Sequence, residues 1–333
     1  MTDWQRWLGA ILVAWNGIAA AADGPQDWLN RMVSAKQQVS YEGTLRHTCA
    51  GVVDVVRIVH RIENGRATAR VTSHAVAGRE IIRNPDEVMC VLPEQKSIVV
   101  ETLQGGSQRE DSPMNKMPGF SDVDTAIYKL AMLQPDRIAG HDTEVIAVRP
   151  VDEYRYGYRL WLDRNKAVAL KFELISEAGE MLEQILFTDI EYSDHIPAAD
   201  VSPSIPMDTF TWQHSTVSVE PPVQRDQSPQ GLMRWRATEL PAGFNLTVRR
   251  SKTVPGSLQP MEQLVYSDGL GSVSVFIEAG VDEDELAEGL SRFAGTHAFT
   301  TTMEDHLITA VGYVPVRTVK MIALSVRPLR ESP

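Results

Sequence analysis

Residues 265–278, VYSDGLGSVSVFIE, place a serine hydroxyl, a carboxylate and two glycines close together in the chain. A serine nucleophile needs a base within hydrogen-bonding reach, and glycines let a backbone come close to a substrate. The same residues also suit a turn, because Ser267-Asp268-Gly269 lies between two runs rich in β-branched residues, and Asp-Gly readily supplies the positive φ of a hairpin. We predict a structural hairpin here and not a nucleophile.

Other catalytic or metal-binding motifs are missing from the sequence. The eight histidines form no H-E-x-x-H pattern, and the two cysteines form no C-x-x-C pattern. The sequence also lacks the G-x-S-x-G elbow, the phosphate-binding loop and the dinucleotide fingerprint. We therefore predict no catalytic residue, no metal and no cofactor, and we expect that the chain is not an enzyme.

The N-terminus has the pattern of an export signal. Residues 1–22, MTDWQRWLGAILVAWNGIAAAA, join an arginine to an apolar run and end in small residues, which predicts a signal peptide cleaved before Asp23. The alternative, a membrane anchor, needs about 20 apolar residues. Export makes Cys49 and Cys90 candidates for a disulfide. The alternative is two buried thiols that pack as small apolar side chains.

Composition indicates a globular protein with room for two domains. The chain has 333 residues, of which 43% are hydrophobic and 23% are charged, and its formal net charge is -12. Nucleic-acid binding needs a strongly basic surface, so the acidic balance argues against DNA or RNA as a partner.

The first domain, residues 23–200, reads as helices and antiparallel strands. Apolar residues at helical spacing predict a helix over 24–38, and a capping-box pattern predicts a second helix over 121–133. Short runs rich in Val, Ile and Thr, separated by turn signals, predict strands over 41–103 and 142–192. We expect an α+β fold with a large, unclosed antiparallel half-barrel wrapped around helices. Either a hydrophobic cavity or a packed core would lie between them.

A proline-rich segment follows the first domain. Residues 201–231 are rich in Pro, Ser, Gln and Asp, which is typical of an extended connection that lets two domains change their relative orientation. Residues 232–333 read as strands with an acidic helix start and a final helix, and thus as a smaller C-terminal α+β domain.

Several blocks follow one another in a telling order along nearly the whole mature chain. The most specific are RIVHRIENG (57–65) and YSDGLGSVSVFIE (266–278). The others are YEGTLRH, GREIIRN, DEVMCVLPEQKSIVVE, GYRLWLD, LKFELISEAGEMLEQILFTDIE and LPAGF. In this order the blocks resemble the RseB/MucB family of periplasmic regulators of envelope-stress sigma factors.

This resemblance implies a periplasmic protein whose large domain is similar to lipoprotein carriers. It implies that the chain binds the periplasmic part of a membrane-spanning anti-sigma factor and shields it from regulated proteolysis. A lipoprotein or lipopolysaccharide-type ligand would trigger release. The family also implies a homo-oligomer, such as a dimer, with the smaller domain holding the anti-sigma factor. The alternative function is a periplasmic lipoprotein carrier or chaperone, for which one lipid-binding domain would suffice.

Two groups of residues are candidates for these contacts. Arg249, Arg250 and Lys252 form a small basic cluster that would meet acidic residues of the partner, although a solvated strand end is the simpler reading. Six apolar residues lie in phase on their strands and are candidates for a lipid cavity, with ordinary core packing as the alternative: Leu160, Leu162, Leu170, Phe172, Leu174 and Leu186.

Overall fold

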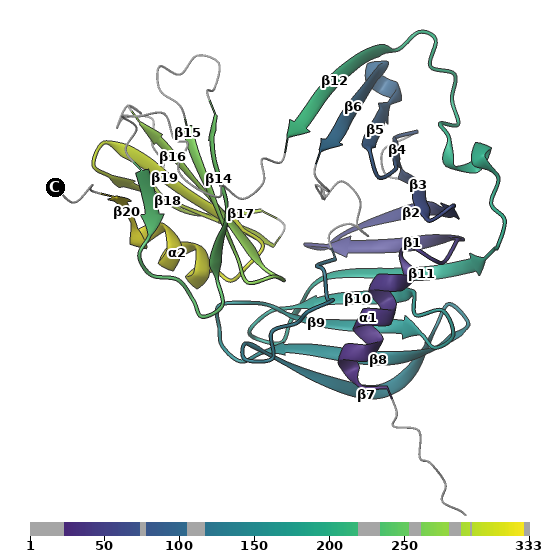
Figure 1. Cartoon of the computed structure of the whole chain (residues 1–333), viewed down its shortest axis with the longest axis horizontal. Coiled ribbons are helices and arrows are strands. Elements are labelled where there is room, and N and C mark those ends of the chain that lie inside the picture. Colours follow the sequence, from purple (N-terminus) through teal and green to yellow (C-terminus); the bar gives the residue numbers. More distant parts are fainter. Residues whose placement is uncertain are drawn as a thin grey trace, which may run out of the picture.

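The structure is a computed structural model that describes residues 23–73, 78–104, 117–218, 234–252, 261–279, 288–293 and 295–329. The predicted signal peptide lies outside these residues. Figure 1 shows two domains, a large one built on an arched sheet and a smaller one built on a second sheet. Within the described ranges, no helix has the length and apolar character needed to cross a membrane.

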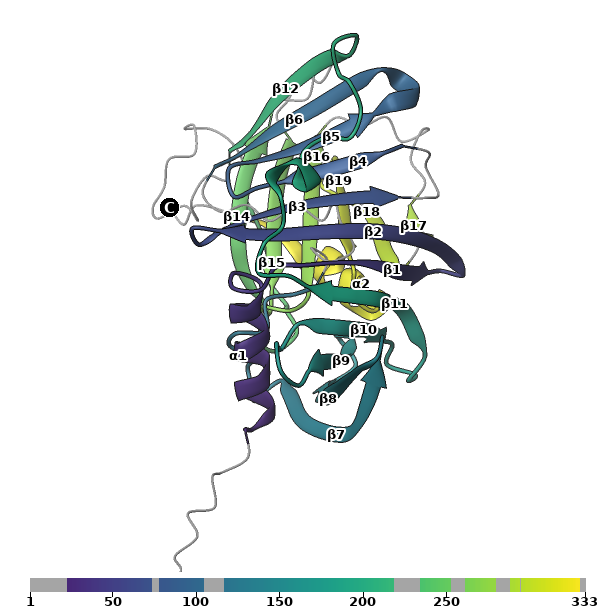
Figure 2. The ribbon, with the colours of Figure 1, turned by 90° about the vertical axis from the view of Figure 1, so that its right-hand side faces the viewer.

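The large domain is built on one sheet of 12 strands in the order β12-β6-β5-β4-β3-β2-β1-β11-β10-β9-β8-β7. All neighbouring strands are antiparallel except β12, which runs parallel to β6. The edge strands β12 and β7 lie at opposite ends of the arch and do not pair, so the barrel is unclosed as predicted (Figure 2). The strands are β1 (Tyr41–Cys49), β2 (Val52–Glu63), β3 (Arg66–Ser73), β4 (Glu80–Arg83), β5 (Glu87–Leu92), β6 (Ser97–Gln104), β7 (Tyr128–Ile138), β8 (His141–Pro150), β9 (Gly157–Asp163), β10 (Ala169–Ile175), β11 (Met181–Tyr192) and β12 (Thr211–Ser218).

Helix α1 (Pro25–Ala35) lies across the strands at the β7–β11 end of this sheet (Figures 1 and 2). Proline at its first turn loses no hydrogen bond, since the first amides of a helix have no partner within it. Trp28, Leu29 and Met32 form its buried face and pack into the core of the large domain. The first predicted helix is thus confirmed.

The junction of β1 and β11 requires a glycine. A Cβ atom at Gly43 would lie 2.4 Å from the carbonyl oxygen of Asp189, a separation that real side chains do not adopt. The register between the two strands shifts between Thr44 and Leu45, which marks a bulge. Bulges bend strands, so this junction contributes to the curvature of the sheet.

The second predicted helix is wrong. Residues 121–127 form turns, in which Asp124 Oδ1 accepts a hydrogen bond from the Ala126 amide at 2.8 Å, and Tyr128 then begins strand β7. Asp124, the second residue of the predicted capping box, therefore holds a turn and not a helix. Pairing of β7 with β8 outweighs the helix propensity of this stretch.

Part of the predicted connection also belongs to the large sheet, because Thr211–Ser218 form β12 along β6. The smaller domain has a six-stranded antiparallel sheet in the order β14-β15-β16-β19-β18-β17 and a two-stranded pair, β13-β20. Its strands are β13 (Arg234–Ala237), β14 (Asn245–Lys252), β15 (Met261–Ser267), β16 (Ser272–Ala279), β17 (Gly289–Phe293), β18 (Thr296–Met303), β19 (His306–Gly312) and β20 (Val326–Leu329). The final helix is confirmed as α2 (Val316–Ser325), which packs into the core of this domain. The predicted acidic helix start lies partly outside the described residues.

Candidate functional site

The Ser267–Gly271 loop is a hairpin turn, as predicted, and it joins β15 to β16. The Ser267 hydroxyl donates a hydrogen bond to the Gly271 carbonyl at 2.8 Å and accepts one from the Gly269 amide at 3.0 Å. Gly269 has φ +98°, a value that glycine adopts without strain. The serine is therefore engaged within the turn.

Asp268 connects this turn to the large domain. Its Oδ1 accepts hydrogen bonds from the amides of Leu270 at 2.9 Å and Gly271 at 2.7 Å. Its Oδ2 accepts hydrogen bonds from Arg155 Nη1 at 2.8 Å and from the Tyr128 hydroxyl at 3.0 Å, both of the large domain. The side chains of Arg155 and Asp268 are both 0% exposed, so this is a fully buried ion pair between the domains.

The Nε and Nη2 groups of Arg155 donate hydrogen bonds to residues of both domains. Nε and Nη2 donate to the two carboxylate oxygens of Asp152 at 2.9 Å, and Nη2 also donates to the Ala242 carbonyl at 2.6 Å. The guanidinium carbon lies 5.5 Å from the ring centre of Tyr128 and 5.4 Å from that of Phe244. Burial raises the pKa of Tyr128 above its ordinary value, so this hydroxyl remains a donor to Asp268. A buried charge is tolerated when it is paired and hydrogen-bonded, and that condition is met here.

Further contacts join the domains. Thr318 Oγ1 donates to the Tyr154 carbonyl at 2.6 Å, and Arg317 forms an exposed ion pair with Glu153. The Tyr313 hydroxyl of the smaller domain donates to Glu183 Oε2 of β11 at 2.6 Å. The domains are therefore held by direct contacts as well as by the chain that connects them.

Glu183 also belongs to a cluster that the sequence analysis missed. His47 and Cys49 lie two residues apart on β1, and Cys49 faces Glu183 across the pairing of β1 with β11. Ligand atoms of the three residues lie within 4.8 Å of one another, with the donor set of a metal site. The His-x-Cys pattern could have indicated two of the three ligands, because residues i and i+2 of a strand share one face. The third, Glu183, comes from far along the chain and has no such signal.

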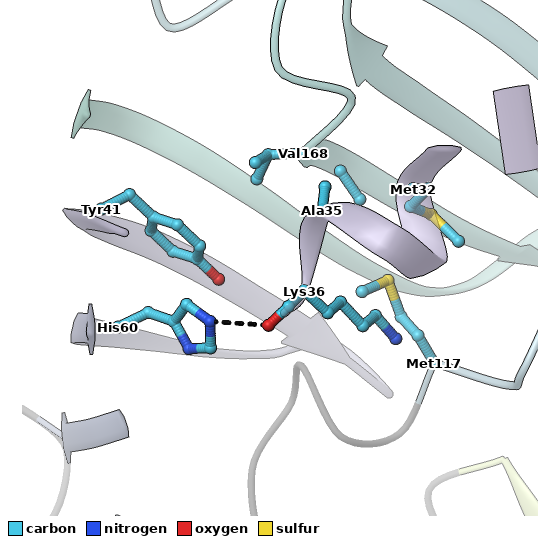
Figure 3. A pocket seen from close by; sticks show the side chains of 8 residues that line it. Met32, Ala35, Lys36, Tyr41, His60, Met117 and Val168 are labelled. Carbon is cyan, nitrogen blue, oxygen red and sulfur yellow. Dashed lines mark hydrogen bonds between the residues drawn. The ribbon is translucent and has the colours of Figure 1, made fainter. Parts of the chain in front are cut away.

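Much of the core of the large domain lies between α1 and the sheet. Among the described residues, a cavity of about 30 Å³ lies between α1, β1 and β2, which is room for about one water molecule. Figure 3 shows Met32, Met117 and Val168 on its apolar side and Tyr41 and His60 on its polar side. The His60 ring stacks on Tyr41 and lies 3.0 Å from the Lys36 carbonyl through Nε2. Burial lowers the pKa of His60, which favours the neutral ring.

Five of the six residues proposed for a lipid cavity are core residues of the large domain, each at most 3% exposed: Leu160, Leu162, Leu170, Phe172 and Leu174. Leu186 lies elsewhere. It pairs with Lys171 and Arg46 and is half-buried, whereas Ile185 and Phe187, its neighbours on β11, are buried in the core. Neighbouring residues of a strand point to opposite faces, so Leu186 lies on the other face of the sheet.

The basic residues of β14 do not form one cluster. Arg249 forms an ion pair with Glu262 and donates to the Trp235 carbonyl at 2.8 Å, so its charge is used within the smaller domain. Arg250 is the next residue of the strand and points to the opposite face; its Nε is buried without a hydrogen-bond partner. The side chain of Lys252 lies outside the described structure.

No disulfide joins Cys49 and Cys90. Cys49 lies on β1 and Cys90 on β5, with β2, β3 and β4 between them in the sheet. Four strand spacings amount to about 19 Å along the sheet. A disulfide needs Cα atoms within about 7 Å, so this arrangement keeps the two thiols apart.

The fold and these contacts define a class of protein: a two-domain β protein in which an unclosed half-barrel, plugged by a helix, is joined to a smaller domain through a buried ion pair. Two family descriptions match the chain, "MucB/RseB N-terminal domain" over residues 24–205 and "MucB/RseB C-terminal domain" over residues 229–327. The chain belongs to the MucB/RseB family.

Relatives and solved structures agree with this assignment. The chain is 30% identical over 321 residues to "Sigma factor AlgU regulatory protein MucB" of Pseudomonas aeruginosa, with 93% of each chain covered. It is 26% identical over 323 residues to "Sigma-E factor regulatory protein RseB" of Escherichia coli, covering 96% of this chain and 95% of that one. A crystal structure of MucB in complex with MucA(peri) matches with a TM-score of 0.69 and 26% identity, covering 92% of this chain and 100% of the other. A crystal structure of MucB gives a TM-score of 0.57 at the same identity, covering 92% of this chain and 98% of the other.

Proposed function

We propose that the chain is a periplasmic, non-enzymatic regulator that binds the periplasmic part of a membrane-spanning anti-sigma factor. The observation that carries this proposal is the match of nearly the whole chain, both domains included, to MucB in its complex with MucA(peri). A function that used only the large domain would not require the smaller domain or the buried contact between them.

A change of domain arrangement on binding is part of the proposal. Identity and coverage of this chain are the same for the crystal structure of MucB and for that of MucB with MucA(peri), and the TM-scores are 0.57 and 0.69, so this chain is more similar overall to MucB in the complex. In our proposal, the ion pair of Arg155 and Asp268 stabilises the arrangement that receives the anti-sigma factor.

The ligand in this proposal is a lipoprotein or lipopolysaccharide-type molecule that acts on the large domain. The concave face offers a continuous apolar core around Leu160, Leu162, Leu170, Phe172 and Leu174. The cavity of about 30 Å³ is far too small for an acyl chain, so an acyl chain would have to displace core side chains. Such a rearrangement couples ligand and partner, because a ligand weakens a complex only by binding the free form more tightly.

Binding would shield the anti-sigma factor from proteolysis, and ligand binding would release it. Arg250 and Lys252 remain proposed contacts for acidic residues of the partner, whereas Arg249 is engaged with Glu262. Self-association, which the family implies, is part of the proposal and would show as a concentration-dependent mass in sedimentation.

Isothermal titration tests the proposal directly. The mature chain, beginning at Asp23, would be titrated with the periplasmic segment of its cognate anti-sigma factor, and again after addition of lipopolysaccharide or a diacylated peptide. We expect binding to the segment and its loss when the lipid is present. Lipid binding without segment binding would replace our proposal with the carrier function. Protection of the segment from a site-specific protease, measured in parallel, checks the shielding step.

A further inference from the structure

His47, Cys49 and Glu183 meet on one face of the large sheet because of strand register. Cys49 of β1 is the direct partner of Glu183 of β11, and His47 precedes Cys49 by two residues on the same strand. Side chains at i and i+2 share a face, and a cross-strand partner lies beside them. His47 Nε2 lies 2.5 Å from Glu183 Oε1, and the three ligand atoms lie within 4.8 Å of one another.

The surroundings of the cluster are those of a built site. The Glu183 side chain is 1% exposed and that of His47 is 15% exposed, so the cluster is shielded and still reachable through the histidine. Tyr313 of the smaller domain donates a hydrogen bond to the second oxygen of Glu183 and lies 4.0 Å from Cys49 Sγ through its hydroxyl. Outer-shell donors of this kind hold a ligating carboxylate in one orientation.

We propose that His47 Nε2, Cys49 Sγ and Glu183 Oε1 form a binding site for a zinc-class divalent cation. A thiolate, an imidazole and a carboxylate suit the borderline-soft Zn²⁺, whereas Ca²⁺ and Mg²⁺ prefer sites made of oxygen atoms. Tetrahedral ligands at zinc bond lengths lie about 3.3–3.6 Å apart. The three ligand atoms lie within 4.8 Å of one another. They reach the tetrahedral geometry when His47 Nε2 and Glu183 Oε1 move apart by about 1 Å and Cys49 Sγ moves closer to both.

The site lies where the two domains meet, which gives it a consequence for the fold. All three ligands come from the large domain, while the residue that orients Glu183 comes from the smaller one. Metal affinity and domain docking are then linked, because each stabilises the arrangement in which the other is strongest. The site stands on its own residues and does not depend on the anti-sigma factor as partner.

Titration of the reduced, mature protein with Co²⁺ tests the site, because a thiolate bound to Co²⁺ gives a charge-transfer absorption band. We expect this band to saturate at one equivalent, and Zn²⁺ to displace the Co²⁺. The two cysteines offer a matched pair of variants: Cys49→Ser should abolish the band, and Cys90→Ser should leave it unchanged. Tyr313→Phe should weaken Zn²⁺ binding by roughly 10–100-fold, the usual cost of an outer-shell change.

Three results would overturn the site: no band in the unsubstituted protein, a band that persists in Cys49→Ser, or a band that Cys90→Ser removes. Circular dichroism shows whether each variant is folded, and Cys49→Ala serves as a second substitution if the serine variant is not. Since the readout is spectroscopic and uses no partner, failure of the metal site leaves the proposed regulatory function to its own test.

Discussion

Replacing Asp268 by asparagine should undock the two domains without unfolding the hairpin. The carboxylate has two tasks: Oδ1 holds the turn amides of Leu270 and Gly271, and Oδ2 accepts from Arg155 and Tyr128. An asparagine has one oxygen and one NH₂ group. With the oxygen toward the turn, its NH₂ faces two donors of the large domain; turned the other way, its NH₂ faces the turn amides. In both orientations the ion pair is lost; the contact between donors lies at the interface in the first orientation and within the turn in the second.

The magnitude follows from burial. Removing one partner of a buried ion pair costs roughly 3–5 kcal/mol, because the remaining charge stays buried without compensation. Arg155 retains both hydrogen bonds to Asp152, so we expect the lower end of this range, about 3 kcal/mol. Each 1.4 kcal/mol is a factor of ten, so the docking equilibrium should shift by roughly 150-fold.

Small-angle scattering measures the docking, and hydrogen exchange at the Ser267–Gly271 loop reports its loss locally. Glu153→Gln is the matched control. It removes an ion pair with Arg317 across the same interface, but those side chains are 67% and 48% exposed, and such pairs contribute about 1 kcal/mol or less. A double-mutant cycle of Asp268→Asn with Arg155→Met should give a coupling above about 0.5 kcal/mol. Equal effects of Asp268→Asn and Glu153→Gln, or additivity in the cycle, would refute the argument.

The remaining predictions concern the large domain. Leu160→Ala should lower the free energy of unfolding by about 2–5 kcal/mol, since the side chain is 0% exposed in the core; urea unfolding measures this, and a loss under 1 kcal/mol would contradict it. Gly43→Ala should disrupt the pairing of β1 with β11, because its Cβ would meet the Asp189 carbonyl at 2.4 Å, and a folded variant of unchanged melting temperature would show the register to be wrong. Burial lowers the pKa of His60 below 6.5, so the unfolded chain binds more protons than the folded chain near that pH. The free energy of unfolding should therefore fall as the pH drops through 6.5. In His60→Phe, which keeps a ring against Tyr41, this pH dependence between 7 and 5 should be weaker.

Local patterns in the sequence were sufficient for much of the fold. The spacing of Trp28, Leu29 and Met32 predicts α1, because apolar residues at the helical period fall on one face. Alternation of apolar and polar residues predicts β9 and β10 in the same way. The helix expected at 121–133 failed because the capping signal at Asp124 is shared by helices and turns. What decided between them was pairing with β8, which involves residues that follow later in the chain.

The contacts between the domains could not be predicted from local patterns, because they join residues that lie far apart in the sequence. Arg155 and Asp268 are separated by 113 residues. The sequence singles out Asp268 only as a turn residue, and Arg155 does not stand out among the chain's many charged residues. The same is true of Glu183, which meets His47 and Cys49 only through the register of β11 against β1. Sequence periodicity specifies which face a side chain occupies, but the partner on that face is set by the topology.

The Ser267–Gly271 loop shows why a catalytic-looking pattern can serve a purely structural role. A loop that exposes a reactive group and a loop that docks on another domain need the same local features. Both need a tight turn, glycines in its backbone and a polar side chain at its tip. The two roles differ in where the polar atoms go. A nucleophile must keep its oxygen available, whereas Ser267 uses its hydroxyl inside the turn and Asp268 places both oxygens in hydrogen bonds, one set holding the turn and the other holding the large domain. Because one carboxylate fixes both the shape of the loop and its attachment, any ligand that separates the domains must supply the free energy that breaks the ion pair of Asp268 with Arg155.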